Sequence, residues 1–208
     1  MYPMPNGGRF VTLEGPEGSG KTSVCREIVG EFSTMKLLVV REPGSTSLGE
    51  KIRTLLQTEN MPARAELMLF EAARACIVDT VIIPQLTSGG YVLCDRFFDS
   101  TTAYQGYGRG FDLDVVRDMN LFATEDLEPD LTIVFDIDPE VGMARKGKAT
   151  DRIEAAGVDF HKRVREGYLA MAKRDPDRLK IVDASRSLKE VVADVCCILR
   201  VTAGWTGC

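Results

Sequence analysis

A glycine-rich loop near the start of the chain constrains its fold more than any other stretch. Residues 15–22 fit the pattern G-x-x-x-x-G-K-S/T without a mismatch, between a β-rich alternating segment at 9–14 and a helical apolar pattern at 22–32. In this setting a P-loop directs successive backbone N–H groups at phosphate, its lysine reaches the β- and γ-phosphates, and its hydroxyl suits Mg²⁺. We therefore expect a nucleoside triphosphate site here, and not a chance glycine turn. The loop consists of Gly15, Pro16, Glu17, Gly18, Ser19, Gly20, Lys21 and Thr22.

The composition is that of one globular domain. The chain has 208 residues, of which 44% are hydrophobic and 27% charged. Its net charge of −5 gives no overall basic field for nucleic acid. Six cysteines lack the C-x-x-C and zinc spacings, and those within apolar patterns are typical of buried thiols in a reducing compartment. With no signal peptide or membrane span visible, we expect a cytoplasmic protein without nucleic-acid or membrane partners.

Apolar runs predict four further strands, at 36–40, 91–94, 131–135 and 180–182. Strands that alternate with helical patterns imply an α/β fold, a five-stranded parallel sheet with helices on both faces, in one domain spanning 1–208. Pro84 is expected to bend or end the helix predicted at 63–81. The lone His161 has charged neighbours and is predicted to lie on a helix surface.

Two strands end in an aspartate that could stand near Mg²⁺. Asp95 is directly followed by Arg96, which pairs a carboxylate for the metal with a cation for phosphate. Asp136 is followed by an Ile-Asp-Pro sequence typical of a helix start. We therefore favour Asp95 as the metal-side carboxylate, with Thr22 as its partner; the alternative is that Asp95 only caps the next turn.

A cluster of cations follows the fourth strand. Its members are Arg145, Lys146, Lys148 and Arg152. A charge run is usually a solvated helix end, and this remains the alternative. Gly147 and Gly157 bracket a segment with few apolar residues, so we predict a lid at about 145–157 whose cations neutralise a phosphoryl group in transit.

Several stretches beyond the P-loop point to one family. The chain has no N-K-x-D guanine-reading motif, which argues against a switch GTPase. The stretches are Arg-Glu-Pro-Gly at 41–44, Leu-Phe-x-Ala-x-Arg at 69–74, Asp-Arg at 95–96, and Ser-x-x-Ala-Tyr-Gln-Gly at 100–106 with Arg-Gly at 109–110. Together with the P-loop they closely resemble thymidylate kinases, which phosphorylate dTMP to dTDP. The resemblance extends from about Phe10 to the final helix.

The resemblance implies roles in binding the base. Phe70 would stack on thymine, while Arg74 and Gln105 would hydrogen-bond its edge, with Ser100 and Thr101 beside them. The spacing of four between Phe70 and Arg74 places both on one helix face, which supports the pairing. Without it, an aromatic residue on an apolar face would more often be part of the core.

It also implies roles toward the sugar and phosphate. Arg53 and Arg96 would clamp the dTMP phosphate, because a guanidinium matches two phosphate oxygens. Glu17 would meet the 3′-hydroxyl, and Tyr104 would occupy the space of a ribose 2′-hydroxyl and so select deoxyribose. A cis peptide is implied before Pro43.

The resemblance further indicates the bacterial type, because Gly18 stands where eukaryotic relatives carry arginine. The implied reaction is ATP + dTMP → ADP + dTDP with Mg²⁺, in a homodimer. The expected catalytic residues are Lys21, Arg96, Arg145 and Arg152. Two alternatives stay open: another nucleoside monophosphate or deoxynucleoside kinase, and a nucleotide-dependent regulatory protein.

Overall fold

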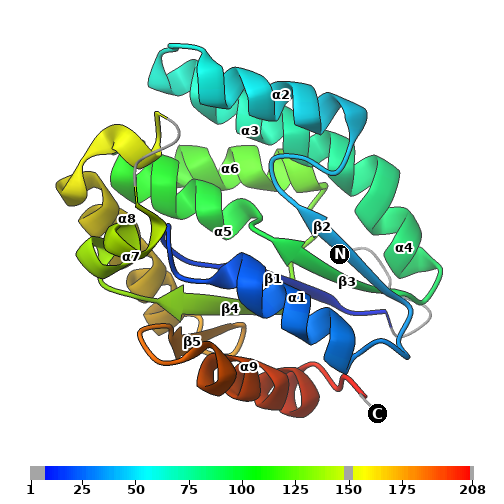
Figure 1. The fold of residues 1–208 in the computed structure, drawn as a ribbon. Coiled ribbons are helices and arrows are strands. Elements are labelled where there is room, and N and C mark those ends of the chain that lie inside the picture. Colours follow the sequence, from blue (N-terminus) through cyan, green and yellow to red (C-terminus); the bar gives the residue numbers. More distant parts are fainter. Residues whose placement is uncertain (1–7, 148–151, 207–208) are drawn as a thin grey trace.

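A parallel five-stranded sheet forms the centre of the protein (Figure 1). The computed structural model describes residues 8–147 and 152–206. The strand order is β2-β3-β1-β4-β5, so the first strand of the chain lies in the middle of the sheet. The strands are β1 (Phe10–Glu14), β2 (Leu37–Arg41), β3 (Tyr91–Asp95), β4 (Leu131–Asp136) and β5 (Leu179–Asp183). The predicted parallel sheet and its five strands are confirmed.

Helices cover both faces of the sheet, as predicted. On one face lie α1 (Lys21–Glu31) and α9 (Leu188–Thr202). The other face carries α3 (Ala63–Ile77), its continuation through a π-helical turn η1 (Val78–Ile82) into α4 (Ile83–Thr87), and α8 (Val158–Arg174). All five residues of β1 are buried. Val11 and Leu13 pack toward α1 and α9, whereas Phe10 packs toward α3 and α4, as expected for a strand covered on both sides.

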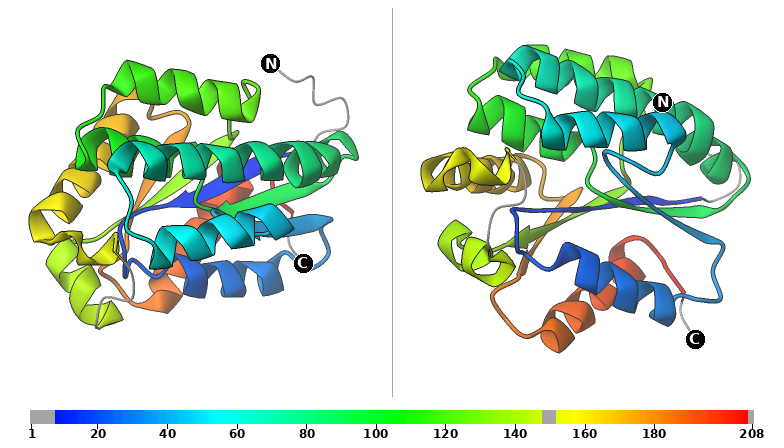
Figure 2. Two further views of the ribbon diagram at one scale, coloured as in Figure 1. Left: turned by 90° about the horizontal axis from the view of Figure 1, so that it is seen from above. Right: turned by 45° about the horizontal axis from the view of Figure 1, so that its top comes forward.

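The remaining helices lie around the carboxyl edge of the sheet or outside the first layer. They are α2 (Ser47–Thr58), α5 (Phe98–Thr101), the π-helical turn η2 (Thr102–Gly108), α6 (Leu113–Thr124), α7 (Pro139–Lys146) and a short 3₁₀ turn η3 (Glu154–Ala156). Helix α3 lies between α2 and α6, which Figure 2 shows from above. Ile52 and Leu56 of α2 pack on Ala73 of α3, so apolar contact holds α2 against α3.

The strand register places the loops after β1, β2 and β3 next to one another at the carboxyl edge of the sheet. Leu13 of β1 is paired with Asp95 of β3 on one side and with Ile133 of β4 on the other. Arg41 of β2 is in turn paired with Asp95. Because all strands are parallel, the P-loop, the loop after β2 and the Asp95–Arg96 step meet at one edge, where ligands of open α/β sheets bind.

His161 lies in the interior at the start of α8. His161 was predicted to lie on a surface and this is wrong: it is 2% exposed, and its Nε2 lies 3.1 Å from the carbonyl oxygen of Glu154. The segment containing η3 covers the start of α8, which charged neighbours in the sequence do not reveal.

The α-helical geometry of α3 ends at Ile77, before Pro84 is reached. The chain continues through η1 into α4, and Pro84 lies in the first turn of α4, where its missing N–H is tolerated.

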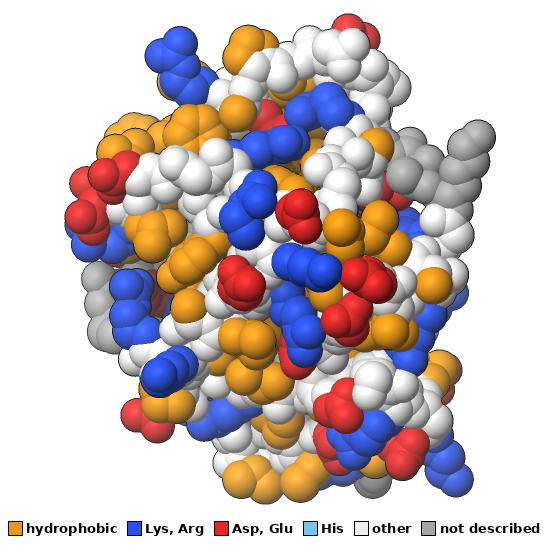
Figure 3. Space-filling view, turned by 90° about the vertical axis from the view of Figure 1, so that its left-hand side faces the viewer, with side chains coloured by type: hydrophobic (Ala, Val, Ile, Leu, Met, Phe, Trp, Pro, Cys, Tyr) orange, Lys and Arg blue, Asp and Glu red, His pale blue; other side chains and the backbone are white. Residues whose placement is uncertain are grey.

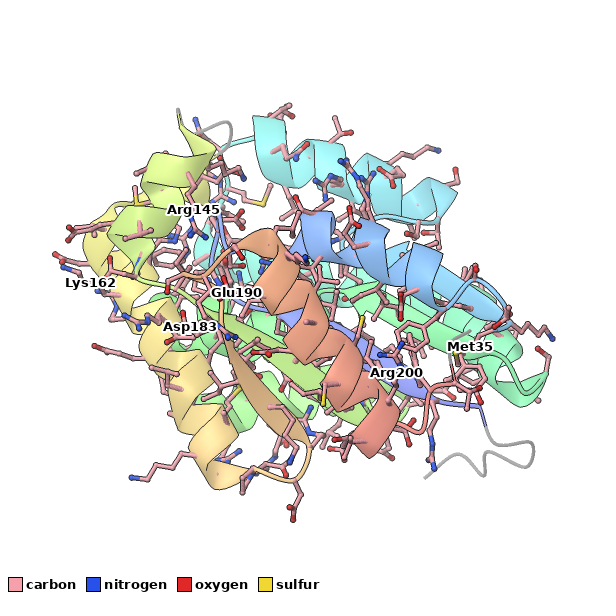
Figure 4. The ribbon with its side chains drawn as sticks, turned by 60° about the horizontal axis from the view of Figure 1, so that its bottom comes forward. Met35, Arg145, Lys162, Asp183, Glu190 and Arg200 are labelled. Atoms are coloured by element: carbon pink, nitrogen blue, oxygen red, sulfur yellow. The ribbon has the colours of Figure 1, made fainter. Side chains whose placement is uncertain are left out.

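The C-terminal segment packs on the side of the sheet that α1 and α9 cover. Trp205 is 1% exposed and meets the rings of Phe32 and Tyr91 edge-on, with centroids 5.2 and 5.9 Å away. An ion pair between Arg200 and Glu31 joins α9 to α1 on the face seen in Figure 4. None of the helices within the described residues is long and apolar enough to span a membrane.

Candidate active site

The P-loop has the backbone geometry that its glycines predict. Gly15, Gly18 and Gly20 have φ angles of 141°, 70° and 85°, a region that side chains rarely adopt, and α1 begins at the next residue. The Nζ of Lys21 donates to the carbonyl oxygens of Gly15 (2.9 Å) and Pro16 (3.0 Å), so it lies inside the curve of the loop. Burial and the nearby Arg96 guanidinium lower the pKa of Lys21 to about 8, and phosphate oxygens would favour its charged form.

Tight packing explains why position 18 carries no side chain. A Cβ on Gly18 would lie 1.9 Å from the carbonyl oxygen of Gly142 in α7. A Cβ on Gly142 would in turn lie 2.3 Å from the carbonyl oxygen of Glu17. The two glycines allow α7 to rest directly on the P-loop, so an arginine at position 18 would not fit. Any further cation for the transferring group must come from another element.

Thr22 and Asp95 form the pair predicted to face Mg²⁺. The Thr22 hydroxyl donates to Asp95 Oδ2 at 3.1 Å, which joins the first turn of α1 to the end of β3. A hydroxyl and a carboxylate are the hard oxygen donors that Mg²⁺ prefers, so these residues fit the ion. Within the described residues no cluster of three or more His, Cys, Asp or Glu side chains forms a complete metal cage. The pair therefore suits an ion shared with nucleotide phosphates and water.

A cleft of about 510 Å³ lies at this edge of the sheet. Six of the eight P-loop residues, 17–22, line it, as does Asp95. In Figure 3, which faces this edge, basic and acidic side chains alternate over the middle of the surface. Every residue predicted for the second substrate lines the same cleft: Glu17, Arg53, Phe70, Arg74, Arg96, Ser100, Thr101, Tyr104 and Gln105.

Arg96 lines this cleft and has a constrained backbone conformation. Its φ angle of 75° is unusual for a residue other than glycine, and such strain is typical of functional positions. Its guanidinium donates to the carbonyl oxygen of Gly15 (3.1 Å), to Glu17 Oε1 (2.5 Å) and to the Ser100 hydroxyl (3.2 Å). Burial opposes ionisation of Glu17, but Arg96, Lys21 and Lys146 outweigh it and hold its pKa well below the usual range.

A buried carboxylate that sequence analysis did not identify supports Arg96. Glu14, fully buried at the end of β1, accepts the backbone N–H of Phe97 at 2.7 Å and the hydroxyls of Ser100 (2.6 Å) and Tyr168 (2.8 Å). Burial and the nearby Asp99 raise the pKa of Glu14. Its position directly before the P-loop is the one signal in the sequence. These bonds hold the chain immediately after Arg96 and so orient the guanidinium.

Arg74 reaches the cleft from within a buried network. It is 1% exposed, and its Nε and Nη1 donate to Glu42 (2.9 Å) and Glu71 (2.9 Å). Nη1 also donates to Asn120 at 3.0 Å, and the guanidinium lies over the Phe97 ring. Burial raises the pKa of Glu42 to about 7 although Arg74 opposes the shift. Nη2 takes part in none of these three bonds, so Arg74 can offer it to a base edge.

The loop after β2 has the geometry that the resemblance implied. The Glu42–Pro43 peptide bond is cis, as predicted. The carbonyl oxygen of Pro43 accepts a hydrogen bond from Arg53 Nη1 at 3.2 Å, which connects this loop to α2. Arg53 lines the cleft, and the bond to Pro43 occupies one nitrogen of its guanidinium.

The predicted lid cations lie in three different places. Arg145 donates to the carbonyl oxygens of Ala184 and Ser185, both at 2.7 Å, after β5; Figure 4 shows it near the start of α9. Lys146 contacts Glu17 at 3.0 Å and also pairs with Glu154. Arg152 lies 2.6 Å from Glu66 and, unlike Arg145, is not among the cleft-lining residues. Lys148 lies outside the described residues.

These features define a P-loop kinase, in which a triphosphate loop and a second set of arginines share one cleft. Comparison with known proteins identifies the family. A model of the thymidylate kinase family matches residues 13–195. The chain therefore belongs to the thymidylate kinase family.

The similarity covers almost the whole chain. The chain is 45% identical over 197 residues to the thymidylate kinase of Bacillus mycoides (strain KBAB4). The aligned region covers 90% of this chain and 95% of that protein. A thymidylate kinase of Bacillus cereus (strain B4264) is 44% identical with the same coverage. The crystal structure of thymidylate kinase from Ehrlichia chaffeensis aligns with a TM-score of 0.76 and 32% identity, over 92% of this chain and 98% of that one.

Proposed function

We propose that the cleft transfers the γ-phosphoryl group of ATP to the phosphate of dTMP, giving ADP and dTDP, the activity of the family. One observation carries the assignment of the site. All nine residues expected to hold dTMP line the cleft that the P-loop enters. A triphosphate on the P-loop and a monophosphate on Arg53 and Arg96 would therefore face each other across it.

The mechanism relies on positioning and charge, without a covalent intermediate. The P-loop N–H groups, the N-terminus of α1 and Lys21 hold the donor phosphates. Arg96 and Arg53 orient the acceptor phosphate, while Glu17 bonds the sugar and Tyr104 excludes a 2′-hydroxyl. Mg²⁺, held by Thr22 and Asp95 with the nucleotide phosphates, would neutralise charge on the transferring group.

A panel of monophosphates tests the assignment of the substrate. Purified protein with ATP and Mg²⁺ should release ADP rapidly with dTMP and poorly with dCMP and dAMP, with dUMP measured alongside. A stronger response to another monophosphate would instead support a different nucleotide kinase. Slow hydrolysis that no monophosphate changes would support a regulatory protein.

Arg74→Ala should raise the KM for dTMP at least ~10-fold, because a hydrogen bond from a charged group is worth about 1.5–3 kcal/mol. The KM for ATP should stay nearly constant, since the residue lies on the base side of the cleft. The change also leaves Glu42 and Glu71 without their cation, so the melting temperature should fall and must be measured separately. Equal changes in both KM values would place Arg74 outside the dTMP site.

The lid cations are proposed to act on the transferring phosphoryl group. Arg145→Ala and Arg152→Ala should each lower kcat at least ~10-fold, less than the ~10³–10⁵ of a lone arginine finger because several cations share the task. The KM for dTMP should change little, and the double variant should lose more activity. The closed packing at Gly18 supports this arrangement, since it excludes a P-loop arginine. Ordinary turnover after all four lid cations are changed to alanine, in a variant folded by circular dichroism, would show a solvated charge run instead.

We also propose a homodimer through the outer face of α3 and α6. Phe122 is 89% exposed and Val115 51% exposed, and with Met119 and Glu71 they line a shallow apolar hollow. An exposed phenylalanine beside such a hollow suits a self-complementary contact with a second copy. Phe122→Asp should yield a monomer by light scattering. The control Val201→Asp changes a residue on α9 that is 81% exposed, and this variant should keep the native mass. An unchanged mass for Phe122→Asp would remove this face from the interface.

The cytoplasm is the proposed location. Cys25, Cys94 and Cys196 are buried thiols. Burial raises the pKa of each of them, so they are mostly protonated and unreactive at neutral pH. Buried thiols of this kind are typical of proteins from reducing compartments.

A further inference from the structure

The buried carboxylate of Glu66 contacts three side chains from other segments: Gln105, Arg109 and Arg152. Glu66 lies in the first turn of α3, its side chain is fully buried, and it is not among the cleft-lining residues. It accepts Gln105 Nε2 at 2.9 Å and Arg109 Nη2 at 3.1 Å, both from the η2 region. Arg152, two residues before η3 begins, lies 2.6 Å from Glu66 Oε2, the oxygen that also accepts Arg109 Nη2.

The contact with Gln105 determines the direction of an amide. A side-chain amide carries an acceptor on one side and two donors on the other. An ionised carboxylate carries acceptors alone, so the atom of Gln105 that faces Glu66 must be the nitrogen. The carbonyl oxygen of Gln105 is then the group left for the cleft, whose wall this residue forms.

The surroundings keep Glu66 ionised. Burial favours its neutral form, but hydrogen bonds from Arg109 and Gln105 and the nearby Arg152 outweigh burial and lower its pKa. Arg109 is itself held in place, because its guanidinium lies over the Phe160 ring at 4.7 Å. A neutral residue at position 66 could accept from the Gln105 amide or donate to it, and the amide direction would no longer be determined.

We propose that Glu66 is a positioning residue that presents the Gln105 carbonyl oxygen to the base and thereby selects bases with a ring N–H at that edge. The inference rests on the proposed function, in which Gln105 and Arg74 contact the base.

The selection follows from the pattern of donors and acceptors. Thymine has an N–H donor at N3 beside the O4 acceptor, so it matches the Gln105 oxygen and the donor of Arg74. Cytosine has an acceptor at N3 and an amino donor at C4, so both contacts would be repulsive. A site whose buried polar groups match one base rejects the mismatched base strongly, because those groups would otherwise stay unpaired.

The test compares kcat/KM for dTMP with kcat/KM for dCMP. Glu66→Gln should lower this ratio at least ~10-fold, part of the ~10⁴–10⁵ that matched polar sites reach. Gln105→Ala should also lower the ratio, and adding Glu66→Gln to it should change the ratio no further, because the two residues act as one unit. Glu140→Gln is the matched control: it makes the same change at an exposed carboxylate on α7 that pairs with Lys162 and does not contact Gln105, so the ratio should stay near the native value.

The outcomes separate this inference from the proposed function. A purely structural Glu66 would lower stability and both kcat/KM values together, and a native ratio in folded Glu66→Gln would overturn the inference while leaving dTMP phosphorylation intact. Native protein that does not phosphorylate dTMP would instead overturn the proposed function. If Glu66→Gln does not fold, a crystal structure of the native protein with dTMP decides: the Gln105 amide must remain in hydrogen-bond contact with Glu66, and an amide turned away from it would refute the proposal.

Discussion

Replacing Lys21 by methionine is expected to abolish phosphoryl transfer, with kcat at least ~10³-fold below the native value. Lys21 is the sole cation of the P-loop, and its Nζ lies among the carbonyl oxygens of Gly15 and Pro16 and the Ser19 hydroxyl. It therefore stands where the β- and γ-phosphates enter the loop. Methionine keeps the length and apolar stem of the side chain, so the loop and α1 should persist. Steady-state kinetics with saturating dTMP measures the loss.

The control for this prediction is another lysine outside the cleft. Lys36, which donates to the Ser88 hydroxyl at 2.8 Å, loses the same charge in Lys36→Met and should keep native turnover. Circular dichroism should show the same helix content in both variants. Near-native kcat in a folded Lys21→Met protein would mean that phosphoryl transfer does not take place at this loop.

Arg96→Ala is expected to cost about 10²–10³ in kcat/KM for dTMP, the range observed when one preorganised charge-stabilising donor is removed. The guanidinium bonds Gly15, Glu17 and Ser100 at once, and it lies over the Tyr104 ring at 5.1 Å. Its loss would remove the phosphate clamp and the main partner of the Glu17 carboxylate. The effect on the KM for ATP should be much smaller.

Arg96→Lys separates geometry from charge. Lysine supplies a point charge but no planar fork, so it cannot hold two phosphate oxygens while contacting Glu17. We expect Arg96→Lys to recover less than a tenth of the lost activity, about 1.4 kcal/mol or more short of native. Full rescue by lysine would show that a charge near Glu17 is sufficient and that the fork has no role.

Motif spacing located much of the site in advance, for a physical reason. The P-loop and the Asp95–Arg96 step each follow a strand directly, and parallel strands end at one edge, so local patterns fix where these residues lie. Phe70 and Arg74 could be paired because they lie one helical turn apart. The strand pattern likewise predicted the five-stranded sheet.

The supporting carboxylates were beyond the reach of such patterns. Glu14 bonds Ser100 and Tyr168, which lie 86 and 154 positions further along the chain, and Glu66 meets Gln105 39 positions away. No local period encodes contacts of this separation. Glu66 does share the helix face of Phe70 and Arg74 at a spacing of four, a signal that in retrospect marks it.

The cationic stretch after β4 shows a similar limit. Four charges close together in sequence suggested one cluster, but Arg145, Lys146 and Arg152 reach three separate partners: the loop after β5, Glu17 and Glu66. Direction along a short helix and the turns after it decides such contacts, and charge content does not reveal it. The single-residue variants of this stretch are therefore more informative than its total charge.

The fate of the γ-phosphoryl group tests the central claim most directly. The protein should be incubated with Mg²⁺, dTMP and ATP labelled in the γ-phosphoryl group, and the products separated by chromatography. We predict that the label appears in dTDP in equal amount to the ADP formed, and that none of it appears in dTDP when Lys21→Met protein is used. Label found in free phosphate, with dTMP unchanged, would contradict the account.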